Sequence, residues 1–247
     1  MTQQMSDAIR IVPMRLPEAG APPTAAPQLT YRGGPIISAV SVAIVYWGDA
    51  WSTPPLGDTR SALDAFFDYI VASPLIDQLT EYDTLSTIIG PGRRAASTIA
   101  AGAPPATVTD ADVRAALAAQ ILSGAVPKPD VDALYFIYLP PNASVTNFGS
   151  ASCQSFCGYH DVIAPATYYA VMPYPNCSGC NAGFTELEAL TIVSSHELCE
   201  AITDPVPGSG WYDDANGEIG DICAWKVKTL GGYQVQQEWS NAANACV

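Results

Sequence analysis

The feature that most constrains the fold of this chain is the segment His196-Glu197-Leu198-Cys199-Glu200. Its polar side chains come together on one side only if the segment is a helix. One helical turn separates positions 196 and 200, so the imidazole and the second carboxylate share a face. Helices of zinc peptidases use this spacing in the pattern H-E-x-x-H, where two histidines bind the metal and the glutamate between them is the general base. Here Glu200 replaces the second histidine. The segment predicts His196 and Glu200 as metal ligands and Glu197 as the base.

The flanking residues predict where this helix begins and ends. Thr185 and Glu188 have the spacing of a capping box, which places the helix start near Glu186. Asp204 precedes Pro205, and a residue before proline is pushed out of the helical region, so the helix should stop there. An apolar stripe recurs at helical spacing: Leu187, Leu190, Leu198 and Ala201. We expect this stripe to pack on the core and the opposite side, with the motif's polar residues, to face a cleft.

An acid-rich segment follows the helix at 210–221 and offers further ligands. Glu218 comes 18 residues after Glu200 (218 − 200). In one large class of zinc peptidases the third ligand is a downstream glutamate, and a nearby acid orients the ligand histidine. We therefore expect Glu218 to be the third ligand and Asp221 to orient His196. Asp204 is an alternative ligand or simply the helix stop.

The sequence leaves open which metal binds and what the second histidine, His160, does. Zinc is the first expectation, but two carboxylate ligands weaken a Lewis acid, and an oxygen-rich shell also suits calcium or manganese. The acids at 211–221 are alternatively a solvated turn or a calcium loop that only stabilises the fold. His160 is a satisfied residue, an alternative third ligand, or a catalytic electrophile that stabilises an oxyanion.

Several short segments follow one another from about residue 30 to the end of the chain. They are GGPI at 33–36, YWG at 46–48, FCGYH at 156–160, SHELCEA at 195–201, GWY at 210–212, EIGDIC at 218–223, QQEWS at 236–240 and CV at 246–247. In this order they resemble the EXORDIUM-like, phosphate-induced protein family, which is best known as secreted plant proteins linked to cell expansion and has bacterial and fungal relatives. The resemblance implies an extracellular α/β domain. The family motif looks like H-E-L-A-E, so Glu200 matches it, whereas Asp204 is an added acid; the family supplies no settled chemistry.

Seven cysteines allow two interpretations. Six are candidates for disulfides: Cys153, Cys157, Cys177, Cys180, Cys223 and Cys246. The first four alternatively form a four-thiolate zinc knuckle, although only the second pair has the C-x-x-C spacing of such a site. The family resemblance favours disulfides, with Cys223 bonded to Cys246. The seventh, Cys199, reads as a small buried core residue.

Composition limits the size of the core and the kinds of partner that the chain can have. With 247 residues, 49% of them hydrophobic and 14% charged, the chain can bury one substantial core. A formal charge of −14 disfavours binding to nucleic acid and to anionic membrane surfaces. No apolar run approaches the roughly 20 residues of a membrane span. Residues 1–30 predict a disordered leader without the apolar core of a Sec signal peptide, so a cytoplasmic location stays open beside the extracellular one that the resemblance implies.

Strand and helix patterns alternate along the remaining chain. Strands are expected at 36–47, 133–139 and 167–172, helices at 59–72 and 109–123, a long loop at 140–165, and a hairpin at 225–230 and 233–239. These elements predict a single α/β domain over 31–247, with a mixed sheet, flanking helices and a zincin-like arrangement of strand and motif helix. In that arrangement strand 167–172 borders the cleft and pairs with an extended peptide.

Two functional hypotheses follow. The first is a metal-dependent hydrolase, foremost a zinc peptidase that acts on a peptide or protein substrate with Glu197 as general base. The alternative is a non-catalytic extracellular binding or signalling protein in which the same acids hold a structural cation. An exposed row of aromatic residues would favour carbohydrate binding; the candidates are Tyr168, Tyr169, Tyr174, Trp211 and Tyr212.

Overall fold

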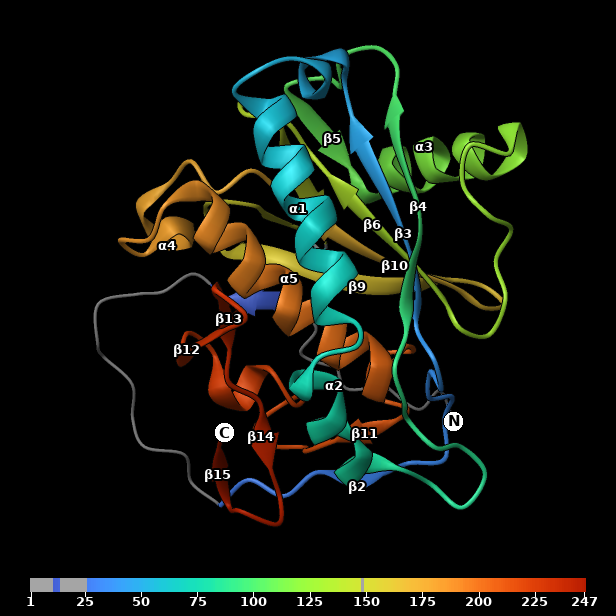
Figure 1. Ribbon diagram of the computed structural model, residues 1–247, viewed down its shortest axis with the longest axis vertical. Helices are drawn as coiled ribbons and strands as arrows, with labels where there is room; N and C mark the ends of the chain where they lie inside the picture. The colour runs from blue at the N-terminus through green and yellow to red at the C-terminus, as the bar shows by residue number, and fades with distance from the viewer. Residues whose placement is uncertain (1–10, 14–25, 148) are drawn as a thin grey trace.

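A six-stranded mixed sheet forms the centre of the protein (Figure 1). The computed structural model describes residues 11–13, 26–147 and 149–247. In spatial order the strands are β1 (Ile11–Pro13), β9 (Phe156–Ile163), β10 (Thr167–Met172), β6 (Ala133–Tyr138), β3 (Ser41–Trp47) and β4 (Arg93–Ala100). The four from β10 to β4 run parallel, while β9 is antiparallel to β10 and to β1. Most of the expected leader lies outside the described residues.

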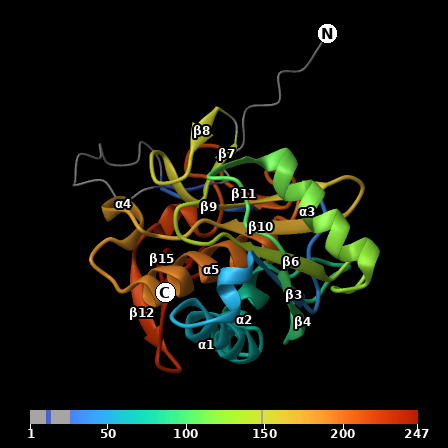
Figure 2. The same ribbon diagram turned by 90° about the horizontal axis from the view of Figure 1, so that it is seen from above.

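Helices cover both faces of this sheet (Figure 2). On one face lies α3 (Asp110–Ser123), and on the other lie α1 (Leu56–Ile70), α2 (Pro74–Leu79) and α5 (Glu186–Thr203). Strand β3 shows why both faces are apolar, because its side chains alternate in direction. Val42 and Ile44 join the core under α1 and α5, and Ala43 and Val45 join the core under α3. The chain is therefore a mixed α/β fold, as predicted.

Short elements complete the chain. They are β2 (Thr30–Tyr31), η1 (Asp49–Ser52), η2 (Thr80–Tyr82), β5 (Thr107–Thr109), β7 (Ser144–Asn147), β8 (Ser150–Ala151), α4 (Ser178–Asn181), β11 (Trp211–Tyr212), η3 (Asp221–Cys223), β12 (Val227–Leu230), β13 (Tyr233–Gln236), β14 (Trp239–Ser240) and β15 (Ala245–Cys246). The β12–β13 hairpin around two glycines is confirmed. Among the described residues, no helix has both the length and the apolar character that crossing a membrane requires.

Two expectations about the strands beside α5 are wrong. The segment 140–165 is not a long loop, because it contains β7, β8 and β9. Strand β10 cannot pair with a peptide, since β9 and β6 already occupy both of its edges. The strand beyond β10 is thus β9, whose pattern the sequence reading missed because polar residues such as His160 and Asp161 interrupt it.

The motif helix begins and ends as predicted. Thr185 and Glu188 form the capping box, and α5 stops at Thr203 with Asp204 as its C-cap. The expectation of an exposed polar side is wrong, because every residue from Ala189 to Thr203 is buried. One side of α5 packs on β9 and β10, and β13 covers another. The polar residues of the motif therefore lie inside the protein.

Three disulfides brace the same region. Cys153 bonds to Cys177, Cys157 to Cys180, and Cys223 to Cys246. The first two join the start of β9 to the short α4 just before α5, so a four-thiolate zinc knuckle is not present there. The third joins η3 to β15, as the resemblance implied. These bonds are compatible with an extracellular protein.

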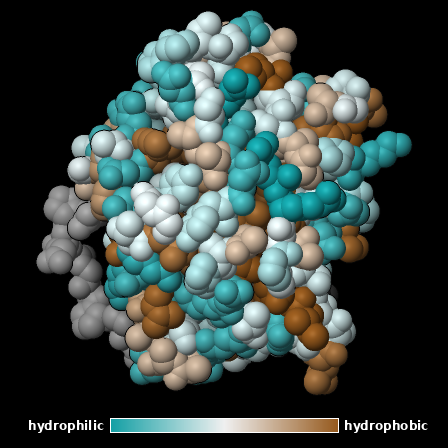
Figure 3. All heavy atoms as spheres, in the orientation of Figure 1, coloured by the Kyte–Doolittle hydropathy of each residue, from teal (hydrophilic) through white to brown (hydrophobic). Residues whose placement is uncertain are grey.

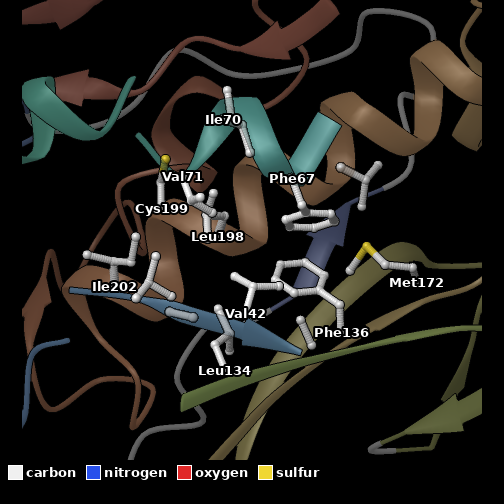
Figure 4. Close-up of a cluster of buried hydrophobic side chains, with 14 of the residues drawn as sticks. Val42, Phe67, Ile70, Val71, Leu134, Phe136, Met172, Leu198, Cys199 and Ile202 are labelled. Atoms are coloured by element: carbon white, nitrogen blue, oxygen red, sulfur yellow. The ribbon is translucent and has the colours of Figure 1, made fainter. Parts of the chain in front are cut away.

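Leu134→Ala tests how much the core under α1 and α5 contributes to stability. Leu134 is fully buried in the cluster of Figure 4, so we expect the free energy of unfolding to fall by about 3 kcal/mol, from lost burial and the cavity left behind. Leu122→Ala is the control, because Leu122 on α3 is 87% exposed; its effect should stay below about 0.5 kcal/mol. Chemical denaturation followed by circular dichroism measures both. Equal losses of stability in the two variants would show that Leu134 is not part of the core.

Candidate metal centre

Two histidines and five acids converge beneath β9 and form what we call the buried cluster: His160, His196, Glu197, Glu200, Glu218, Asp221 and Glu238. His160 comes from β9, and three members come from α5. Glu218 and Asp221 come from the chain that turns back toward α5 after its end, residues 205–221, which we call the returning segment. Glu238 follows β13. All are at most 1% exposed except Asp221, which is partly exposed. The sequence placed all but one of them in the candidate site.

His160 lies between the helix and the returning segment. Its Nδ1 is 3.0 Å from Glu197 Oε2 and 3.6 Å from Glu200 Oε2. Its Nε2 is 3.5 Å from Glu218 Oε1 and 3.2 Å from the backbone oxygen of Asp204. The lone histidine outside the motif is thus a central member of the cluster.

His196 lies on the other side of Glu200. Its Nε2 is 2.9 Å from Glu200 Oε1, but the two atoms lack hydrogen-bond alignment. The backbone N–H of Asp221 donates to the same Oε1 at 3.1 Å. Gly220 packs directly against this pair, because a Cβ there would lie 2.8 Å from His196 Nδ1 and 2.9 Å from Glu200 Oε1. The absence of a side chain at Gly220 lets the returning segment reach the helix.

Most members of the cluster have buried polar atoms without a hydrogen-bond partner among the described residues. These atoms are His196 Nδ1 and Nε2, Glu197 Oε1, Glu200 Oε2, both Glu218 oxygens, Asp221 Oδ1 and both Glu238 oxygens. Buried carboxylates without partners are costly, and proteins neutralise them by pairing, protonation or a bound cation. Because the cluster gathers such atoms in one place, it could hold a cation.

Two sets of three side chains have the spacing to hold a metal ion. One set is His160, Glu200 and Glu218, and the other is His196, Glu200 and Asp221; in each set the ligand atoms lie within 4.8 Å of one another. The sequence grouped Glu218 with His196, whereas the structure brings Glu218 to His160 and Asp221 to His196. Glu200 is common to both sets. The mixture of imidazole and carboxylate suits zinc or manganese.

Burial and mutual repulsion dominate the electrostatics. Burial raises the pKa of Glu218 and Asp221 well above the usual range, and the charge of Glu200 adds to it. Burial disfavours the imidazolium of His160, but its hydrogen bonds to Glu197 and Glu200 prevail and raise its pKa to about 10. Burial works against ionised Glu200 too, yet the two histidines lower its pKa to about 2. The cluster therefore attracts positive charge, as protons or as a metal.

Asp204 shapes the turn that brings the returning segment back. Its carboxylate accepts hydrogen bonds from the backbone N–H groups of Gly208, Ser209 and Gly210 at 2.6, 3.0 and 2.6 Å. A Cβ at Gly210 would lie 2.3 Å from the oxygen of Thr203, so the turn passes too close to α5 for a larger residue. Asp204 is the helix stop; its carboxylate accepts hydrogen bonds from this turn and also lies against Glu218, so its alternative role as a ligand stays a prediction.

Glu238 is the member that sequence reasoning missed. Both of its oxygens are buried without a partner, and burial raises its pKa well above the usual range, partly offset by His196. It lies in the QQEWS segment at 236–240, which carried part of the family resemblance. That segment was therefore the signal in the sequence that could have pointed to Glu238.

Two hollows on the surface lie away from the cluster. They have volumes of about 460 and 470 Å³, are lined by Tyr31 and Ser86 and include no member of the buried cluster. Figure 3 shows apolar residues gathered at the lower right, the part of this face that contains the segment after α2, where Leu85 and Ile88 are exposed. The five aromatic candidates do not form the exposed row that would favour carbohydrate binding, because all are buried except the half-buried Trp211.

Comparisons with known proteins add no assignment. No protein-family model matches the chain, and neither the curated proteins nor the solved structures contain a match. The likeness to the EXORDIUM-like family rests on the quoted segments alone.

Gly220→Ala tests the close approach of the returning segment to α5. We expect the free energy of unfolding to fall by about 1–3 kcal/mol, because the added methyl group must displace His196 or Glu200 in a packed interior. Gly90→Ala is the matched control, since a Cβ there meets nothing within 4 Å. Urea denaturation of both variants gives the comparison. If Gly220→Ala were as stable as Gly90→Ala, the packing described here would be wrong.

Proposed function

We propose that this protein is a metal-dependent hydrolase that acts on peptide bonds, with its metal in the buried cluster. The observation that carries the proposal is the set of buried imidazole and carboxylate atoms that face one another without hydrogen-bond partners. A bound metal would polarise a carbonyl oxygen or lower the pKa of a water molecule. The likeness to the EXORDIUM-like family is compatible with this proposal.

Glu197 is the general base in this proposal. Its Oε2 is held by His160 Nδ1 at 3.0 Å, while its Oε1 is buried and has no partner among the described residues. A carboxylate fixed by one oxygen and free at the other can take a proton at a defined position. His160 Nδ1 therefore positions Glu197, and as a candidate ligand His160 would use Nε2, which lies 3.5 Å from Glu218 Oε1.

The strand β9 supports a peptide as the substrate. Its outer edge pairs antiparallel with β1, in the register Ile11 with Tyr159 and Val12 with Gly158. A Cβ at Gly158 would lie 3.2 Å from Glu197 Oε1, so β9 passes directly over the proposed base. An extended peptide added at this edge would run beside Glu197. In this proposal β9 takes the place of the zincin-like strand beside the motif helix, once β1 leaves its outer edge.

The N-terminal strand is the proposed barrier to substrate. The short dark-blue arrow of Figure 1 is β1, which contacts both α5 and η3, and Val12 is 1% exposed. A substrate would take the place of β1 along β9. This exchange explains how a site with almost no exposed surface can serve a hydrolase.

Glu197→Gln tests the hydrolase. We expect the purified variant to keep its metal, because Glu197 is in neither candidate ligand set, and to lose cleavage of a fluorescence-quenched peptide library by at least roughly 100-fold. Elemental analysis and the cleavage assay are made on the same samples. Dialysis against a chelator should abolish cleavage in the parent, and added zinc or manganese should restore it. A parent that holds metal and cleaves no library member would overturn the proposal.

Val12→Asp in the full chain tests the role of β1. A carboxylate at this buried position costs about 2 kcal/mol or more, so β1 should leave β9 and cleavage should rise by roughly tenfold or more. Val131→Asp is the control, because Val131 is 72% exposed. A lower rate in Val12→Asp with unchanged folding would show that β1 supports the site instead of covering it.

A structural cation is the second candidate, and the burial of the cluster favours it. A cation bound only to the folded state stabilises it by mass action. In this case a chelator lowers the melting temperature, and Glu197→Gln changes no activity because the parent has none. The cleavage assay therefore separates the two candidates.

A further inference from the structure

We propose that the buried cluster holds two metal ions, with Glu200 as the carboxylate that bridges them. This inference rests on the proposed function only in requiring that the cluster binds metal. The two ligand sets are His160 with Glu218 and His196 with Asp221, and Glu200 completes both.

The two oxygens of Glu200 face different imidazoles. Oε1 is 2.9 Å from His196 Nε2, and Oε2 is 3.6 Å from His160 Nδ1. A carboxylate that presents one oxygen to each of two ligand groups has the geometry of a bridge. The unaligned contact of His196 Nε2 with Oε1 fits this arrangement, because two ligands of one ion point at the metal and not at each other.

One ion cannot use all five side chains. Ligand bonds to zinc are about 2.0–2.2 Å long, so atoms that share an ion lie within about 4.4 Å of one another. The five side chains form two separate sets within 4.8 Å and no common one among the described residues. An ion in either set leaves the other histidine and acid outside its coordination shell.

Unpartnered atoms are present in both sets. Both oxygens of Glu218 lack a hydrogen-bond partner in the first set, and both ring nitrogens of His196 and Oδ1 of Asp221 lack one in the second. Each buried polar atom left without a partner has a cost in stability. A single ion would relieve one set and leave that cost in the other.

The charge of the cluster is compatible with two divalent ions. With all five acids ionised and both histidines neutral as ligands it carries −5, so one divalent ion leaves −3 and two leave −1. Among the described residues, no lysine or arginine forms an ion pair with a member of the cluster. Glu197 and Glu238 belong to neither ligand set and lie beside the two sets, Glu197 at His160 and Glu238 near His196.

Metal counting on the full chain tests this inference. After saturation with zinc and removal of free ions, elemental analysis should give two ions per chain for the parent, one for Glu218→Gln, one for Asp221→Asn, and fewer than one for Glu200→Gln. Asp58→Asn, at an exposed position of α1, is the control and should keep two. Circular dichroism establishes that each variant is folded.

Manganese loading gives a second measurement that needs no variant. Two Mn²⁺ ions bridged by Glu200 should give an exchange-coupled electron paramagnetic resonance spectrum, whereas a single ion gives an isolated six-line signal. One ion per parent chain with the isolated signal overturns the bridge and leaves the proposed hydrolase standing. No bound ion in the parent overturns both.

Discussion

Buried carboxyl groups with too few basic partners are the constraint on which this structure depends. Five acids lie around two histidines beneath β9, and most of their oxygens have no hydrogen-bond partner among the described residues. Isolated charges of this kind are too costly to bury, so the folded state requires protons or cations in the cluster. The surrounding sheet and helices supply the apolar contacts that offset what remains of this cost.

The elements that carry the cluster are far apart in sequence, and specific features bring them together. Two disulfides join β9 to the segment just before α5, and the third fixes η3 to the last strand. The turn built on Asp204 reverses the chain after α5, and Gly220 lets that chain reach His196. The disulfides, the Asp204 turn and Gly220 thus position most of the backbone that carries the cluster.

Local signals made part of this predictable from sequence. The capping box at Thr185 and the stop at Asp204 gave the limits of α5, because both act within a few residues. The pairing of Glu218 with His160, and of Asp221 with His196, was not predictable, since it depends on how the returning segment crosses the helix. Strand β9 was missed because two polar residues interrupt its apolar pattern: His160 is buried in the cluster, and Asp161 pairs with Arg114. The burial of α5 on all sides likewise depends on β13, which lies far along the chain.

Cys199 is the free thiol of this chain, and its burial makes it a probe of the interior. All seven cysteines lie in the described residues, and Cys199 alone carries no disulfide. It is fully buried in α5 beside Glu200, and burial raises the pKa of its thiol well above the usual value, so it stays protonated and unreactive in the closed protein. A thiol reagent can reach it only when the motif helix separates from its neighbours. The rate at which a thiol reagent modifies Cys199 therefore measures how often the interior opens, one residue away from the central carboxylate of Glu200.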